Sequence, residues 1–273
     1  MSCYKFSVAM CVYKNDNPEH FKLALDSVLN QTVKPDEIVL VVDGPIPSSL
    51  QNVINEFEKP NFFKPIYLPE NRGLGNALKV AVENCSYELI ARMDSDDIAV
   101  ENRFEQQIEM FKNDNELDIV GGDVAEFIGD TENVVSIRAV PKEHNEICKY
   151  IRKRCPFNHP AVMYKKSSVQ AVGGYLDWFW NEDYYLWIRM LIGNCKLANT
   201  GTVLVNMRVG EEMYARRGGI RYFKSELGLQ KLMLKEKIIG FPRFLINVSE
   251  RLIIQVLLPN KLRAFVFKKI ARK

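Results

Sequence analysis

The sequence predicts an α/β fold in which a mostly parallel sheet carries helices on both faces, followed by a C-terminal helical extension. Short apolar runs alternate with amphipathic stretches over about the first hundred residues, which is typical of strands that alternate with helices. These runs are apolar throughout, as in strands that are buried on both faces. After Gly219 only helical patterns remain.

The elements of the first part follow from these patterns in chain order. The run 37–44 is rich in Val and closes with Asp43 and Gly44, whereas Phe21, Leu25 and Leu29 have helical spacing. Strands that are joined through helices form a parallel sheet with helices on its faces. We expect strands at 6–13, 37–44, 63–71 and 88–96, and helices at 18–32, 48–59 and 73–85.

The second part is less regular, and we divide the chain at its end. The segment 181–192 begins with acidic residues and continues with helical spacing, which favours a helix N-terminus there. These patterns predict a domain over 1–219 and a helical extension over 220–273. The other expected elements are a helix from Phe104 to about Asn113, a strand pair over 117–129, mixed strand and helix over 158–175, and helix breaks at 240–242 and at Pro259.

Composition restricts the class of protein. The 273 residues are 47% hydrophobic and 26% charged, which is typical of a globular chain. The six cysteines form no CxxC pair and several lie in apolar runs, so we expect reduced core residues in a cytosolic protein. We expect neither a signal peptide nor a membrane span, because no apolar stretch reaches about 20 residues.

The net charge of +3 is unevenly distributed. From Pro242 onward eight Lys or Arg residues stand against one Glu, so this tail carries +7 and the rest of the chain −4. A slightly acidic body with a basic, apolar tail argues against nucleic acid as the partner.

Three carboxylates, those of Asp94, Asp96 and Asp97, lie at the end of the strand expected at 88–96. Like charges so close together indicate either a bound cation or a solvated turn. Because ligands bind beyond the carboxyl ends of parallel strands, we expect Tyr13, Asp43 and this acidic turn to meet in one crevice.

Three chemistries use such a turn. A calcium loop fails, since Ile98 and Ala99 stand at its fifth and sixth positions, where the sixth requires glycine. A phosphatase could use Asp94 as its nucleophile. A divalent cation held by carboxylates and by the oxygens of a nucleotide diphosphate is the third possibility, because Mg²⁺ and Mn²⁺ favour that mixed shell.

Seven motifs occur together in this chain: VAMCVYKND, FKLALDSVLNQT, EIVLVVDGP, NRGLGNALKVAVENC, IARMDSDDIAVENRFEQQ, NHPAVMYKKSSVQAVGGY and NEDYYLWIRML. Over roughly residues 5 to 215, these motifs resemble the family 2 glycosyltransferases. The resemblance implies a GT-A fold with a Rossmann-like sheet, a nucleotide-sugar donor and inversion at the anomeric carbon. It also implies a nucleotide-binding half over about 1–103 and an acceptor-side half over 104–219.

The resemblance implies roles for residues that would bind the nucleotide. Asp43 would accept a hydrogen bond from the base N3–H, which uracil has and cytosine lacks, so UDP is favoured. Cys11, through its backbone, and Tyr13 would contact the base. Arg72 would reach the base or the diphosphate. We exclude a dinucleotide-binding loop at Gly73-Leu74-Gly75, because this motif lacks the third glycine of such a loop.

The same resemblance implies the reacting groups. Asp96 would hold Mn²⁺ or Mg²⁺, Asp94 would bind the ribose or the metal, and Asp97 would cap the following helix. Asp183 would be the general base that removes the proton of the acceptor hydroxyl. Without the resemblance, Glu182 and Asp183 are ordinary acidic residues at a helix N-terminus.

Three further residues are candidates for acceptor contact or support, and two more for binding the nucleotide-sugar. His159 and Trp187 lie in motifs near the acceptor, and His159 is equally suited to a structural hydrogen bond; Glu182 joins them. Arg216 and Arg217 either close over the diphosphate or form a solvated charge pair.

The tail has two interpretations. After the apolar stretch 244–258, Leu262, Phe265 and Ile270 fall along one helical face among basic residues, which suits the surface of an anionic membrane. A helical hairpin packed on the main domain or in a dimer is the alternative. The first makes the protein peripheral on the inner face of the cell membrane.

We therefore predict an inverting, metal-dependent enzyme. It would transfer a sugar from UDP to a hydroxyl of a lipid-linked or oligosaccharide acceptor in bacterial surface polysaccharide synthesis. The alternatives are the phosphatase and a catalytically silent relative that binds nucleotide-sugars.

Overall fold

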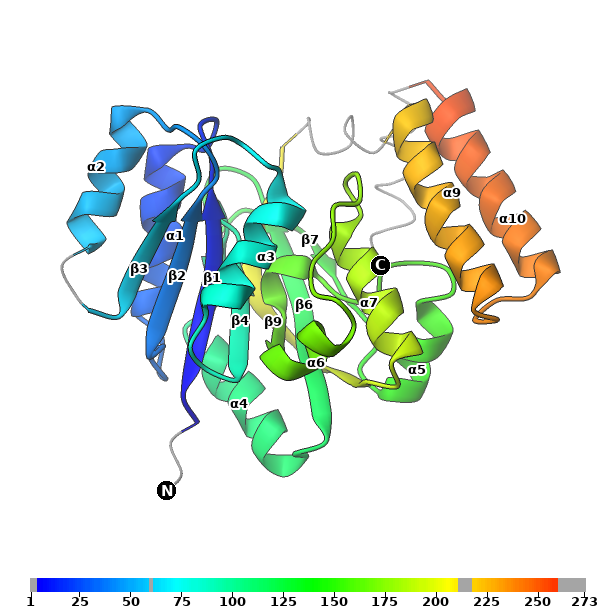
Figure 1. The fold of residues 1–273 in the computed structure, drawn as a ribbon, viewed down its shortest axis with the longest axis horizontal. Helices are drawn as coiled ribbons and strands as arrows, with labels where there is room; N and C mark the ends of the chain where they lie inside the picture. Colours follow the sequence, from blue (N-terminus) through cyan, green and yellow to red (C-terminus); the bar gives the residue numbers. More distant parts are fainter. Residues whose placement is uncertain (1–3, 59–60, 211–217, 260–273) are drawn as a thin grey trace.

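The computed structural model describes residues 4–58, 61–210 and 218–259. One nine-stranded sheet forms its centre, with helices packed on both faces and a helix pair at one side (Figure 1). Across the sheet, neighbouring strands follow the order β3-β2-β1-β4-β8-β6-β9-β5, with β7 added to β6. The GT-A prediction is confirmed.

The first four strands form a parallel unit, as expected. The strands β1 (Phe6–Val12), β2 (Glu37–Val42), β3 (Phe63–Tyr67) and β4 (Leu89–Met93) pair in parallel in the order β3-β2-β1-β4. Their carboxyl ends lie at one edge because each returns through a helix. The connecting helices are α1 (Pro18–Leu29), α2 (Ser48–Phe57) and α3 (Leu74–Asn84).

The second part of the sheet is mixed. Both β8 (Met163–Lys165) and β7 (Val134–Arg138) run antiparallel to their partners, and β5 (Ile98–Ala99) pairs antiparallel with β9 (Lys196–Arg208). Only β6 (Leu117–Phe127) and β9 are parallel here. The predicted strand pair over 117–129 is wrong, since this segment is a single strand. Its pairing with β9 has register shifts between Leu117 and Ile119 and on both sides of Asp123.

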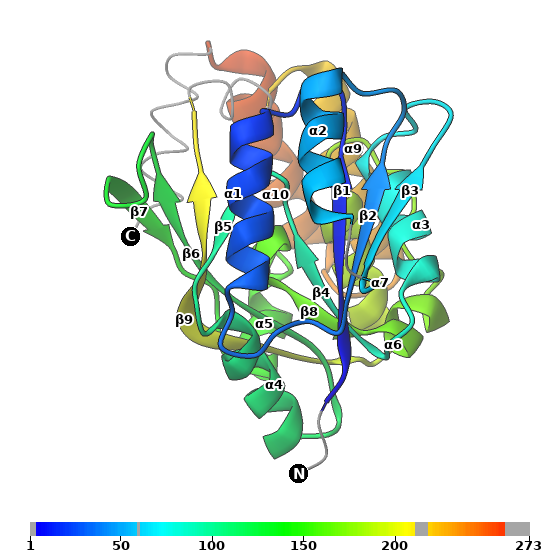
Figure 2. The same cartoon turned by 90° about the vertical axis from the view of Figure 1, so that its left-hand side faces the viewer.

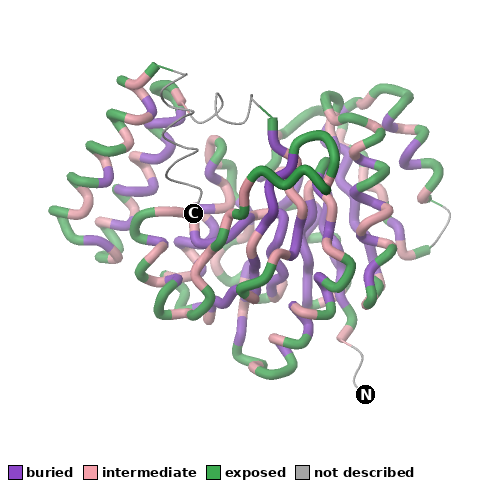
Figure 3. The backbone as a smooth tube through the Cα atoms, turned by 180° about the vertical axis from the view of Figure 1, so that it is seen from behind, coloured by how far each residue is buried: buried purple, intermediate pink, exposed green. Residues whose placement is uncertain are grey.

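Helices divide between the two faces because strand side chains alternate. Val8 and Met10 of β1 pack with α1, α2 and α4 (Arg103–Asn113), whereas Ala9 faces the opposite core with α3. That second core also contains α5 (His144–Tyr150), α6 (Lys166–Ala171) and α7 (Glu182–Ile192). The buried sheet and the exposed outer helix surfaces are visible in Figure 3.

The C-terminal helices stand beside α7, on the side of the molecule opposite α2 (Figures 1 and 2). The break between α9 (Ile220–Lys235) and α10 (Phe241–Leu252) falls at Gly240 and Pro242, as predicted. A π-helical turn, η2 (Ile253–Leu257), continues α10. Residues 260–273, which contain the predicted amphipathic tail, lie outside the described part of the chain.

The helix pair is attached to the main body by buried polar contacts. Asn247 donates to the Arg152 carbonyl (2.8 Å) and Arg251 to the Lys153 carbonyl (2.9 Å), both in the main body. Within the pair, Asn247 donates to Gln230 of α9 (2.8 Å), and Arg251 forms an ion pair with Glu226 of α9 (2.6 Å). The outer face of α10 and η2 is apolar and exposed, with Phe241, Leu245, Ile246, Leu252, Ile253 and Leu257. No helix within the described ranges is both long and apolar enough to cross a bilayer.

Candidate active site

Two cavities meet at the N-terminus of α7. The strand-end cavity, of about 770 Å³, lies at the carboxyl ends of β1, β2 and β4. The C-terminal cavity, of about 580 Å³, lies between α7 and the pair α9–α10. Trp180 and Tyr222 line both cavities, so the two are neighbours.

The strand-end cavity brings together the residues that the sequence placed in one crevice. Cys11 lies near the end of β1 and Tyr13 follows it, Asp43 follows β2, and Asp94 and Asp96 follow β4; all five line the cavity. Burial and nearby carboxylates raise the pKa of the Cys11 thiol, so it stays protonated. The convergence follows from the parallel order of these strands.

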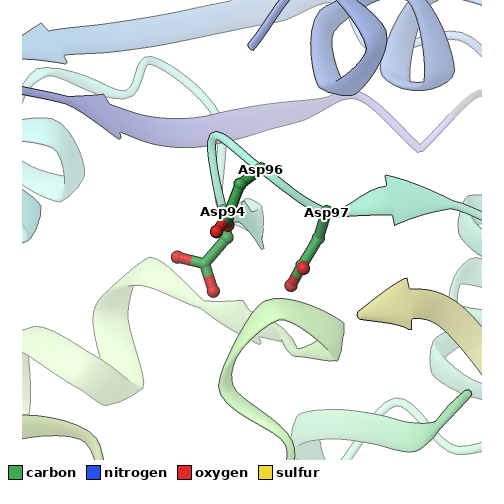
Figure 4. A group of neighbouring side chains, drawn as sticks. All are labelled: Asp94, Asp96 and Asp97. Carbon is green, nitrogen blue, oxygen red and sulfur yellow. The ribbon is translucent and has the colours of Figure 1, made fainter. Parts of the chain in front are cut away.

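The acidic turn projects three side chains to the same side (Figure 4). One carboxylate oxygen from each of Asp94, Asp96 and Asp97 lies within 4.8 Å of the other two. Asp94 and Asp96 line the cavity, whereas Asp97 is buried and accepts a hydrogen bond from the Arg208 backbone N–H (2.8 Å). The predicted helix cap by Asp97 is therefore wrong, because β9 takes that carboxylate.

Proton affinities in the turn reflect confinement and like charge. Burial, together with the charges of Asp94 and Asp16, raises the pKa of Asp96 to about 6. Burial, together with Asp94 and Asp96, raises the pKa of Asp97 well above its ordinary value. A cation among these oxygens would relieve the repulsion.

A buried guanidinium lies beside this turn. Arg92 is 1% exposed and forms an ion pair with Asp94, while its Nε and Nη1 have no partner within the described structure. Coulombic attraction to Asp94 raises the pKa of Arg92 against the effect of burial, so the charge is retained. Sequence analysis missed Arg92, because the sequence of a strand does not show that one of its charged side chains will be buried.

Asp16 is a further carboxylate that sequence analysis missed. It lines the strand-end cavity and accepts hydrogen bonds from the Ser95 hydroxyl (2.8 Å) and the Tyr13 backbone N–H (3.1 Å). Burial raises its pKa to about 6. Its place just after β1 matches that of Asp43 after β2, a signal that could have identified it.

Asp43 is already engaged by the turn that follows β3. Its two carboxylate oxygens accept hydrogen bonds from the backbone N–H groups of Arg72 (2.7 Å) and Gly73 (3.0 Å). Gly44 allows this approach, since its φ is +85° and a Cβ there would lie 2.6 Å from the Asn71 nitrogen. Each oxygen keeps a lone pair for a ligand.

The side chain of Arg72 does not line the cavity. It extends toward Glu70, with 3.7 Å between Nε and the nearest carboxylate oxygen, and is 48% exposed. Arg72 thus contributes its backbone to the site through Asp43. Arg216 and Arg217 lie outside the described residues.

Glu182 and Asp183 are consecutive but line different cavities. Glu182 lines the strand-end cavity, and burial together with the Asp183 charge raises its pKa to about 7. Asp183 lines the C-terminal cavity, where Cys155 donates to it (3.6 Å). Burial raises the pKa of Asp183, against the opposing effects of a hydrogen bond from the Tyr184 N–H and the charge of Arg138.

His159 and Trp187 line neither cavity. The His159 Nε2 and the Tyr175 hydroxyl are 2.9 Å apart, and burial lowers the pKa of His159 well below its ordinary value. Trp187 is fully buried, with its ring against Phe157 at 5.4 Å between centroids. These rings fix α7 and hence its acidic N-terminus.

The loop before α7 supplies aromatic walls that sequence analysis missed. Trp178, Phe179 and Trp180 line the strand-end cavity. Trp180 is 50% exposed and has a φ of +56°, an unfavourable backbone conformation that is often found at functional sites. The run Asp-Trp-Phe-Trp was the available signal.

The residues present fit a divalent cation. Two carboxylates, Asp94 and Asp96, face one cavity from the same turn, and hard oxygen ligands are those that Mg²⁺ and Mn²⁺ prefer. The five described cysteines are free, as expected of a reduced chain.

Comparison with known proteins shows the family. The profile of "Glycosyl transferase family 2" matches residues 7–171, which is more than half of the chain. The chain belongs to this family and is a glycosyltransferase. The phosphatase alternative is therefore wrong.

Three similar proteins illustrate the relationship. An uncharacterized glycosyltransferase of Haemophilus influenzae is 41% identical over 269 residues, covering 98% of this chain and 100% of the relative. The Escherichia coli UDP-Gal:alpha-D-GlcNAc-diphosphoundecaprenol beta-1,3-galactosyltransferase is 38% identical, covering 98% and 97%. The fold matches S. aureus TarS 1-349 in complex with UDP-GlcNAc, with a TM-score of 0.67 and 17% identity over 91% of this chain and 72% of that one.

Proposed function

We propose that this glycosyltransferase moves a sugar from UDP, with inversion, to a hydroxyl group of a lipid-linked glycan in bacterial surface polysaccharide synthesis. The observation that carries the proposal is the pair Glu182–Asp183 at the border of the two cavities, opposite the acidic turn. A donor in one cavity and an acceptor in the other would meet at this border.

The strand-end cavity suits the donor. Asp43 can accept the N3–H of uracil with its remaining lone pairs, while Cys11 and Tyr13 lie on the wall after β1. Asp94 and Asp96 would hold Mn²⁺ or Mg²⁺, which when bound stabilises the negative charge of the departing diphosphate. The donor named for the Escherichia coli relative is UDP-galactose, which supports UDP as the nucleotide.

Asp183 is suited to be the general base. The acceptor oxygen attacks the anomeric carbon from the face opposite UDP, the bond from that carbon to the diphosphate oxygen breaks, and the hydroxyl proton passes to Asp183. A carboxylate whose pKa is raised by burial is a stronger base than an exposed one. Attack on the opposite face inverts the configuration.

A lipid-linked acceptor is supported by the relative and by the surface of the chain. The acceptor named for the Escherichia coli relative is linked through a diphosphate to undecaprenol. The exposed apolar face of α10 and η2, followed in the sequence by six Lys or Arg residues over 260–273, suits the inner surface of an anionic membrane.

Donor hydrolysis tests the proposed activity. The protein with Mn²⁺ should release UDP from one member of a UDP-sugar panel, and transfer of that sugar should invert its anomeric configuration. A thermal shift with UDP and Mn²⁺ in the absence of any turnover would instead indicate a silent binding protein. Retention of configuration would contradict the inverting mechanism.

Liposome flotation tests the membrane surface. The full chain should float with anionic liposomes at low salt and less at high salt, because the attraction is partly electrostatic. A chain that ends at Pro259 keeps α10, which is attached to the body, and should float less. Equal flotation of both chains would contradict the role of the basic tail.

A further inference from the structure

The two cavities differ sharply in charge. Among the described residues that line the strand-end cavity there is no Lys or Arg, but there are six carboxylates: Asp16, Asp43, Asp94, Asp96, Asp177 and Glu182. The C-terminal cavity is lined by four cationic side chains: Arg138, Lys153, Arg154 and Arg251. The wall that holds the proposed base is therefore the basic one.

Much of this positive charge is available to a ligand. Arg251 is neutralised by Glu226 at 2.6 Å. Within the described residues, neither Arg138 nor Lys153 has a carboxylate oxygen within 4.0 Å. Arg138 lies close enough to Asp183 for its charge to lower the pKa of that carboxyl. The remaining acid, Glu250, is exposed at the rim.

These charges match a particular part of the acceptor. A donor diphosphate can be neutralised by a divalent cation that carboxylates hold, whereas a second diphosphate without its own metal needs cationic side chains. A neutral sugar needs neither. We infer that the C-terminal cavity is the acceptor subsite and that Arg138 and Lys153 bind the diphosphate of a lipid-linked sugar; this inference rests on the proposed function.

The C-terminal cavity lies where the lipid chain of a bound lipid-linked sugar could extend out of it. Ile254 of η2 lines the cavity, and its neighbours Ile253 and Leu257 are 51% and 66% exposed. These two belong to the apolar outer face of α10 and η2. A lipid chain attached to the diphosphate would thus pass from the cavity onto an apolar surface, with the sugar toward Asp183.

Binding of decyl diphosphate tests this subsite without knowledge of the sugar. The probe is titrated by calorimetry into the full chain with saturating UDP and Mn²⁺, which occupy the donor site, and decyl sulfate serves as the singly charged comparison. Decyl diphosphate should bind at least 10-fold more tightly, because charge-assisted hydrogen bonds to a diphosphate are stronger and more numerous.

A matched pair of variants assigns the binding to the cavity. Lys153→Gln should weaken decyl diphosphate about 10-fold, since it removes one charge-assisted contact. Arg152→Gln removes a positive charge at the neighbouring exposed position, which does not line the cavity, and should leave binding unchanged. Arg138→Gln, at the end of β7, is a second test of whether the cavity binds decyl diphosphate.

The outcomes separate this inference from the proposed function. Equal affinity for decyl sulfate and decyl diphosphate, or equal effects of Lys153→Gln and Arg152→Gln, would overturn the diphosphate subsite. The KM of a diphosphate-linked acceptor should rise in Lys153→Gln and stay unchanged in Arg152→Gln. Absence of hydrolysis in the unaltered chain would reject the proposed function even if decyl diphosphate bound.

Discussion

The strand-end cavity and the C-terminal cavity differ in how they are built. The first is formed mainly by residues that follow β1, β2 and β4, so their order along the chain places them together. The second combines the end of β7, the turn after α5, and the helices α7, α9 and α10. The first is acidic, whereas the second combines four basic side chains with three carboxylates, one of which is Asp183.

Under the proposed function, this difference would separate two tasks. The sheet edge would supply carboxylates for a metal and a nucleotide, while the second cavity would supply the groups that bind an acceptor. Consecutive residues of a helix point about 100° apart, so Glu182 and Asp183 can serve the two cavities from a single turn. The following changes test this division.

The largest expected effect is on the acidic side. Asp96→Ala should abolish transfer, because it removes the carboxylate most exposed to the cavity within the acidic turn. The fold should remain intact, since the change also removes a repelling charge. Turnover with Mn²⁺ measures the loss of transfer, and thermal unfolding measures whether the fold is intact.

Glu101→Ala is the control for Asp96→Ala. Glu101 is an exposed carboxylate nearby in the sequence and lines neither cavity. Its variant should retain activity. Near-normal turnover of Asp96→Ala would show that the metal assignment is wrong.

The second effect concerns the basic cavity. Asp183→Asn preserves shape but removes the base, so kcat should fall by about 10² to 10⁴. UDP affinity should barely change, because Asp183 does not line the strand-end cavity. Steady-state kinetics and UDP titration measure these quantities; loss of UDP binding would make Asp183 a structural residue.

A smaller effect is expected at the border. Trp180→Ala should raise the KM of both donor and acceptor by about 3- to 10-fold, a loss of roughly 1 kcal/mol each, because Trp180 lines both cavities. Leu23→Ala, an exposed apolar side chain of α1 that lines neither cavity, is the control. If only one KM changes, the ring belongs to one cavity.

The last change concerns how the free energy of unfolding depends on pH. The pKa of Glu182 is raised to about 7 from an ordinary 4.5, so the folded chain binds more protons than the unfolded chain between these values. Stability of the chain without metal or nucleotide should therefore fall as pH rises through this window. In Glu182→Gln, the free energy of unfolding should decrease by about 1 to 3 kcal/mol less over this pH range than in the unaltered chain.

Denaturant unfolding at pH 4.5 and pH 8 measures the change. Glu83→Gln, at an exposed position outside both cavities, should keep the slope of the unaltered chain. If the free energy of unfolding depends on pH in Glu182→Gln as it does in the unaltered chain, burial in the strand-end cavity does not raise the pKa of Glu182.

Local patterns determined the parallel half of the fold and the donor side of the site. Apolar runs that alternate with amphipathic helices fix strand order, and strand order brings Asp43 together with Asp94 and Asp96. The same reasoning would have included Asp16, which was missed although it follows β1. The motifs also identified the family.

Only the tertiary structure decided the rest, because it depends on contacts between distant segments. The segment 117–129 was expected to turn back on itself, but pairing with β8 and β9 keeps β6 extended. Arg92 became buried beside Asp94, and Asp97 was taken by the backbone of Arg208. The strand β9, which sequence analysis did not assign, thus decided which carboxylates face the cavity.

The acceptor side shows the same limit most clearly. Glu182 and Asp183 are indistinguishable as two acids that begin a helix, and the direction in which each points depends on how α7 packs against α3 and α9. Likewise, Lys153 lines a cavity and Arg152 does not, although both are exposed cations in one turn. The sequence determined which charges are present, and packing between distant helices decided which of them share a cavity.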